Sequence, residues 1–63
     1  MTPGTYTVRA TRDFRVGSRH DLAIAKGQTR VVNADGEGQF CTYSDSLSFF
    51  GVCRIGDGWE IVP

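Results

Sequence analysis

The sequence predicts a small all-β domain, and three observations lead to that prediction. Apolar and polar side chains alternate across residues 5–16, as they do on a half-buried strand. Short apolar runs are separated by Gly, Asp, Asn and Ser, which is typical of strands joined by turns. Nowhere does an apolar stripe with the 3.6-residue period of a helix extend to a useful length. With 63 residues, the chain forms one domain, residues 1–63, with a core of marginal size.

The chain divides into five or six short strands. Arg12 interrupts the first of them, because it places a charge on the apolar side. The pair Asp35-Gly36 is the strongest turn signal, since Asp-Gly favours tight hairpin turns. In chain order the expected elements are a strand at residues 5–16, a loop at 17–21, a short strand or extended turn at 22–25, a turn at 26–28, a strand at 29–32, a turn or loop at 33–38, a strand at 39–43, a connector at 44–46, an apolar segment at 47–55, a turn at 56–58 and a last strand at 59–62.

The same alternation predicts which side chains share the core. The expected members are Val8, Ala10, Leu22, Ile24, Val32 and Val52. The two cysteines, Cys41 and Cys53, are expected to be reduced thiols that fill apolar positions. Two cysteines make no dense disulfide framework, nothing resembles a secretory signal, and no apolar run approaches the roughly 18 residues of a membrane span. These features predict a cytoplasmic protein that does not associate with a membrane.

Charge is balanced overall but unevenly distributed. Residues 1–30 carry six basic and two acidic side chains, whereas residues 31–63 carry one basic and five acidic ones. Either folding mixes these charges into an ordinary solvated surface, or a basic patch around Arg12, Arg15 and Arg19 meets an acidic partner.

The first half of the chain resembles a Src homology 3 domain. Residues 10–14 (Ala-Thr-Arg-Asp-Phe) stand where that family has Ala-Leu-Tyr-Asp-Tyr. Residues 21–28 (Asp-Leu-Ala-Ile-Ala-Lys-Gly-Gln) stand where it has a pattern like Glu-Leu-Ser-Leu-Lys-Lys-Gly-Asp, at a matching spacing. The match covers residues 6–32 fairly well and the rest of the chain weakly. It implies a small β-barrel in which the 15–21 loop is the RT loop and the 33–38 loop is the n-Src loop.

Four groove positions differ from the family pattern. Arg12 replaces the first groove tyrosine, Phe40 the groove tryptophan and Arg54 the groove proline, while Asp57 replaces the late tyrosine unless Trp59 takes its place. The family's proline-rich ligands need aromatic ridges and an acidic loop. The changes therefore predict a groove that prefers acidic or phosphorylated partners, because guanidinium groups pair with carboxylate and phosphate.

Six residues are candidates for partner binding, each with a structural alternative. Arg12 either lines the groove or escapes to water at a strand edge. The aromatic candidates are either exposed in the groove or needed for the core, because each ring buries a large area. The candidates are Arg12, Phe14, Arg15, Arg19, Phe40 and Trp59.

These residues favour a non-catalytic protein-interaction module, an adaptor-type domain. His20 is the sole histidine, the cysteines lack metal-site spacing, and the serines suggest no nucleophile. We therefore expect no enzyme activity, metal or cofactor. Nucleic acid is the weaker choice of partner, because the net charge is zero and the second half is acidic. The alternative function is a free-standing phage- or plasmid-type inhibitor that binds a larger enzyme or nucleic-acid complex, suggested by a short chain beginning at Met1. The sequence leaves the oligomeric state open.

Overall fold

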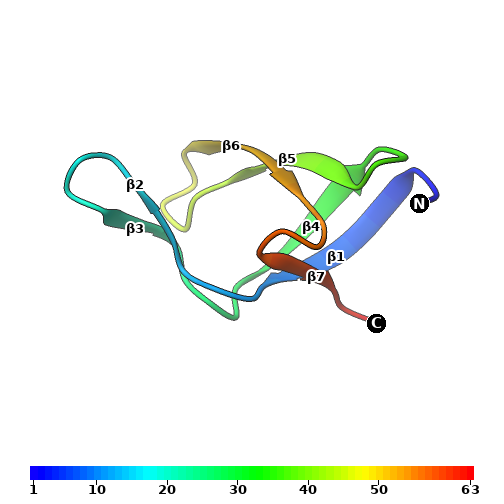
Figure 1. Ribbon diagram of the computed structural model, residues 1–63, viewed down its shortest axis with the longest axis horizontal. Coiled ribbons are helices and arrows are strands. Elements are labelled where there is room, and N and C mark those ends of the chain that lie inside the picture. Colours follow the sequence, from blue (N-terminus) through cyan, green and yellow to red (C-terminus); the bar gives the residue numbers. More distant parts are fainter.

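The computed structural model describes residues 1–63 as seven short strands without a helix (Figure 1). The all-β prediction is confirmed. β1 lies between β4 and β7 in one antiparallel sheet, and the β2–β3 and β5–β6 hairpins form two more. No segment is a helix long and apolar enough to cross a membrane. The strands are β1 (Gly4–Ala10), β2 (Phe14–Val16), β3 (Asp21–Ile24), β4 (Thr29–Ala34), β5 (Gln39–Tyr43), β6 (Phe49–Arg54) and β7 (Trp59–Ile61).

Two details differ from the expected barrel of five or six strands. The expected strand at 5–16 is two strands, because the chain leaves the first sheet at Arg12. Hydrogen bonds made by the residues on either side of Arg12 stabilise this break. The Thr11 amide donates to the Gly58 carbonyl (2.9 Å), and Asp13 Oδ1 accepts a hydrogen bond from the Lys26 amide (2.8 Å). The barrel is also not closed, since no ladder joins β4 to β5.

The core lies between the sheets and is built around Trp59, which is 2% exposed. Members come from every strand, so each strand contributes to burial. They are Val8, Ala10, Phe14, Ala23, Ile24, Val32, Phe40, Cys53 and Trp59. Four of the six residues predicted for the core are therefore confirmed.

The other two, Leu22 and Val52, were predicted wrongly, and they are 48% and 68% exposed. A register shift between Phe14 and Arg15 in the β2–β3 hairpin lets both Ala23 and Ile24 face inward, which leaves Leu22 outside. Val52 pairs with Cys41 on the outer face, so its neighbour Cys53 takes the inner position. A shift of one residue exchanges the faces of a strand, and alternation by itself does not locate such shifts.

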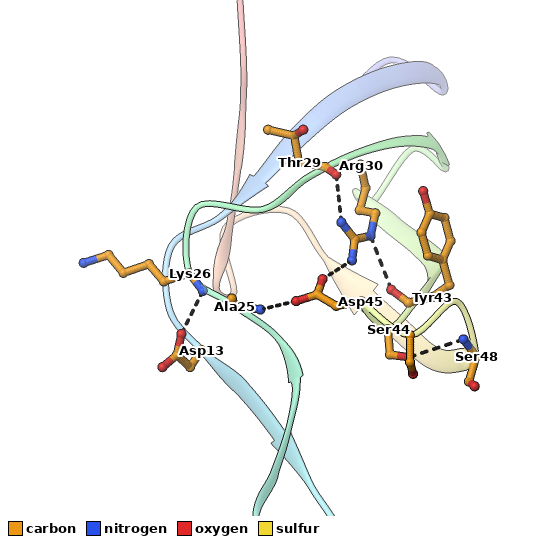
Figure 2. A network of polar contacts seen from close by, with 10 residues as sticks. Asp13, Ala25, Lys26, Thr29, Arg30, Tyr43, Ser44, Asp45 and Ser48 are labelled. Carbon is orange, nitrogen blue, oxygen red and sulfur yellow. Dashed lines mark hydrogen bonds and ion pairs between the residues drawn. The ribbon is translucent and has the colours of Figure 1, made fainter.

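A polar network ties the β2–β3 hairpin to the rest of the molecule (Figure 2). Buried Arg30, from β4, forms an ion pair with Asp45 (2.6 Å) and donates to the Tyr43 carbonyl (3.3 Å). The other Asp45 oxygen accepts a hydrogen bond from the Ala25 amide (3.0 Å), and the Asp45 amide donates to the Ala23 carbonyl (2.6 Å). One aspartate in the β5–β6 turn thus connects β4 with the end of β3.

This network predicts how stability depends on pH. The hydrogen bond from Arg30, followed by that from the Ala25 amide, holds the pKa of Asp45 below its ordinary value of 3.8. Because the folded-state pKa is depressed, the stabilisation is complete above the ordinary pKa and is lost as the pH falls through the folded value. We expect the free energy of unfolding to decrease below about pH 4, and Asp45→Asn to remove part of that decrease.

Urea denaturation across a pH series measures this effect. The amides of Gln39 and Glu37 also lower the pKa of Asp35, so some acid sensitivity remains in the Asp45→Asn variant. Asp21→Asn is the matched control, because the Asp21 carboxylate makes no ion pair. An identical pH dependence in wild type and Asp45→Asn would contradict the role assigned to this carboxylate.

Candidate functional site

The aromatic candidates meet in one cluster inside the molecule. Phe14 stacks on Trp59 with ring centroids 5.3 Å apart, and Phe40 meets Trp59 edge-on at 5.5 Å. Phe50 packs edge-on against Phe14 at 5.7 Å. Phe14, Phe40 and Trp59 are all buried, so the structural alternative holds for these rings: they support the surface from below and form no exposed ridge.

Arg12 covers this cluster at the surface. Its guanidinium lies 4.1 Å from the centre of the Phe14 ring, a cation–π arrangement, and donates to the Asp13 carbonyl (3.3 Å). Gly58 leaves the space that this stack occupies. A Cβ there would lie 2.6 Å from Phe14 Cζ and 3.0 Å from Arg12 Nε. The Arg12 guanidinium, which interrupts the apolar side of the first expected strand, therefore packs on the Phe14 ring.

Arg12 forms one wall of a pocket of about 240 Å³. Arg54 and Asp57, from the end of β6 and the turn after it, contribute the other charges. Neither arginine has a carboxylate within ion-pair distance. The pocket thus combines two guanidinium groups, one carboxylate and an apolar floor. Its full lining is Arg12, Phe14, Gln39, Phe50, Val52, Cys53, Arg54 and Asp57.

The structure separates Arg15 and Arg19 from this pocket. Both belong to the β2–β3 hairpin and neither lines the pocket. The Arg15 side chain donates to the His20 carbonyl (3.1 Å) and lies 3.8 Å from Asp13 Oδ2. The basic patch drawn from sequence is therefore divided, and Arg12 alone reaches the pocket.

Three residues of the pocket lie outside the set predicted to bind a partner: Phe50, Arg54 and Asp57. Arg54 and Asp57 were noted only as replacements of family residues. The missed signal is that both residues are charged and stand at groove positions expected from the resemblance, and the fold brings them to one pocket with Arg12. No three His, Cys, Asp or Glu side chains are grouped so that they could hold a metal ion.

The two cysteines differ in burial, whereas the sequence predicted that both fill apolar positions. Both cysteines are free, but Cys41 is exposed and only Cys53 is buried, so the expectation that both fill apolar positions is wrong for Cys41. Burial raises the pKa of the Cys53 thiol above its ordinary value of 9.0. A thiol reacts as the thiolate, so Cys53 is protected both by burial and by protonation.

We expect one thiol to react with iodoacetamide in the native protein and two after unfolding in denaturant. Peptide mapping by mass spectrometry should place the native label on Cys41. Cys41→Ser is the control and should leave no rapidly reacting group. Equal native labelling of both cysteines would contradict the burial of Cys53.

Comparison of the chain with protein-family models, with curated proteins and with solved structures finds no match.

Proposed function

We propose that this chain is a non-catalytic protein-interaction module, a divergent Src homology 3 domain, which binds an acidic or phosphorylated segment of another protein. The Arg12–Arg54 pocket is the binding site, and the observation that carries the proposal is its pair of guanidinium groups without ion-pair partners. Carboxylate and phosphate are the groups that guanidinium binds in a bidentate manner.

The order of the elements supports the assignment to this family. The β2–β3 hairpin occupies the place of the RT loop, and the turn between β4 and β5 occupies the place of the n-Src loop. The pocket lies beside the break between β1 and β2 and the start of β5. Two free cysteines, one of them exposed, suit the reducing cytoplasm.

A titration with an oligoglutamate peptide, followed by amide chemical shifts in NMR, tests the proposal. The combined Arg12→Gln and Arg54→Gln variant should bind about tenfold more weakly, because two solvent-exposed ion pairs are lost and each contributes about 0.2–1 kcal/mol. Binding should also weaken with salt, since exposed charges are screened over about 8 Å at physiological ionic strength.

Arg15→Gln combined with Arg19→Gln is the matched control. It removes the same charge from the β2–β3 hairpin, outside the pocket, and should keep most of the affinity. If the pocket variant binds the peptide as well as wild type at every salt concentration, the two arginines are ordinary surface charges.

A further inference from the structure

A second, larger cleft adjoins the Arg12–Arg54 pocket. Its volume is about 740 Å³, and it is lined by residues 31–35, residues 39–41 and Val52. Two residues, Gln39 and Val52, line both hollows. The charged pocket and the cleft are therefore adjacent parts of one surface.

The cleft presents apolar side chains to solvent. Val31 is 69% exposed and Val52 is 68% exposed, and exposed Cys41 lies opposite Val52 in the β5–β6 ladder. Exposed apolar side chains that line one cleft supply apolar contact for a partner. The one acidic residue of the cleft is Asp35, in the turn between β4 and β5.

The strand edges that border the cleft also have unpaired backbone groups. β4 pairs only with β1, and β5 pairs only with β6, so their facing edges have no ladder. β1 forms hydrogen bonds on both sides. The Ala10 amide donates to the Gln28 carbonyl on the side of β4, whereas the Thr7 carbonyl accepts from the Val62 amide on the side of β7. Thr7 lies opposite Val31 in the register. By this alternation Val31 directs its amide and carbonyl away from β1, toward the cleft.

The backbones of the two edges bond to each other only at the turn end, where the Asp35 amide donates to the Gln39 carbonyl (3.0 Å), and at the other end the Arg30 side chain donates to the Tyr43 carbonyl (3.3 Å). Between these bonds the open edges offer hydrogen bonds that an extended peptide can use. The neighbouring pocket supplies the positive charge, and the cleft supplies apolar contact.

We infer that one extended segment of the partner occupies both hollows, with an acidic side chain between Arg12 and Arg54 and alternating apolar side chains over Val31 and Val52. This inference rests on the proposed function and specifies its ligand. Alternation is required because successive side chains of a strand point to opposite faces. The ligand is thus an acidic residue followed by a short amphipathic strand.

Selection from a displayed library of random peptides tests the inference. Peptides of about ten residues cross both hollows at a rise of roughly 3.3 Å per residue. The protein is attached through its C-terminus, because the Met1 amino group donates to the Gly36 carbonyl (2.7 Å) beside the cleft. Selected peptides should carry Asp or Glu followed by apolar residues at alternate positions. The tightest peptide should shift the amide signals of both Val31 and Arg54 in NMR.

Two variants separate the two halves of the site. Val31→Thr with Val52→Thr keeps the β-branched shape but removes apolar contact, and it should weaken the selected peptide about fivefold to tenfold. The pocket variant, Arg12→Gln with Arg54→Gln, should weaken binding of the selected peptide about tenfold. Val16→Thr is the matched control, because Val16 is an exposed strand valine outside both hollows, and its affinity should be unchanged.

The possible failures are distinguishable. In one outcome, the selected peptides are acidic but show no apolar alternation, and they bind the Val31→Thr and Val52→Thr variant as tightly as wild type. That outcome would overturn the inference and leave the proposed function standing. Apolar peptides without an acidic residue would overturn both, and so would the absence of any enriched pattern. Dimerisation in analytical ultracentrifugation that is lost in the valine variant would assign the cleft to a second copy and also overturn the inference.

Discussion

Gly58→Ala is expected to destabilise the fold by about 2–4 kcal/mol, from left-handed backbone strain and overpacking together. Gly58 has φ +83°, and its missing Cβ would lie 2.6 Å from the Phe14 ring and 3.0 Å from Arg12 Nε. The Phe14 ring is itself packed on Trp59, so it has little freedom to retreat. Urea unfolding followed by fluorescence of the sole tryptophan measures the loss.

Gly56→Ala separates the two causes. Gly56 lies in the same turn with φ +95°, but a Cβ there would have no atom within 4 Å. The Gly56→Ala variant should therefore lose only about 1 kcal/mol of unfolding free energy, which is the cost of the left-handed backbone conformation. Equal losses of unfolding free energy in the two variants would show that the close approach to Phe14 and Arg12 does not add to the destabilisation.

Trp59→Ala is expected to have a still larger effect, about 3–5 kcal/mol. The indole is the centre of the aromatic cluster, in contact with Phe14 and Phe40. A domain of this length has a total stability of roughly 3–9 kcal/mol, at about 0.05–0.15 kcal/mol per residue. The loss is a large fraction of that total, so the variant should unfold at a much lower urea concentration than wild type, as followed by circular dichroism.

Trp59→Phe is the control for this prediction. It keeps an aromatic ring in the cluster and removes the indole Nε1–H, which makes no hydrogen bond of standard geometry. Its stability should lie well above that of Trp59→Ala. If Trp59→Ala unfolded at the same urea concentration as wild type, the core would not depend on this ring.

The fold class could be predicted from the sequence because it depends on local patterns. Alternation through β1 places Val8 and Ala10 inside, and the turn glycines mark the ends of strands. Leu22 and Val52 could not be placed in this way, because their faces depend on the register of the β2–β3 and β5–β6 hairpins. Register is set by pairing between strands, and a single sequence shows it only indirectly.

The candidate site was predicted less completely, for a related reason. Arg12 was recognised because it breaks a local alternation. Arg54 comes from the far end of the chain and reaches the same pocket only through the β5–β6 hairpin and the turn before β7. Arg15 and Arg19, close to Arg12 in sequence, belong to a hairpin outside the pocket. Proximity in sequence was therefore a poor guide to proximity in space.

The β2–β3 hairpin extends from one end of an elongated molecule, whose dimensions are 37 × 18 × 18 Å (Figure 1). Its exposed tip, residues 17–20, contains Arg19 and lies away from the sheet of β1, β4 and β7. A trypsin cut after Arg19 would leave β1 paired with β4 and β7 across the break. Exposed tips of this kind tolerate nicking and insertion. The protein should consequently be divisible there into two fragments that reassemble, which makes the tip a natural position for a split reporter or a grafted loop.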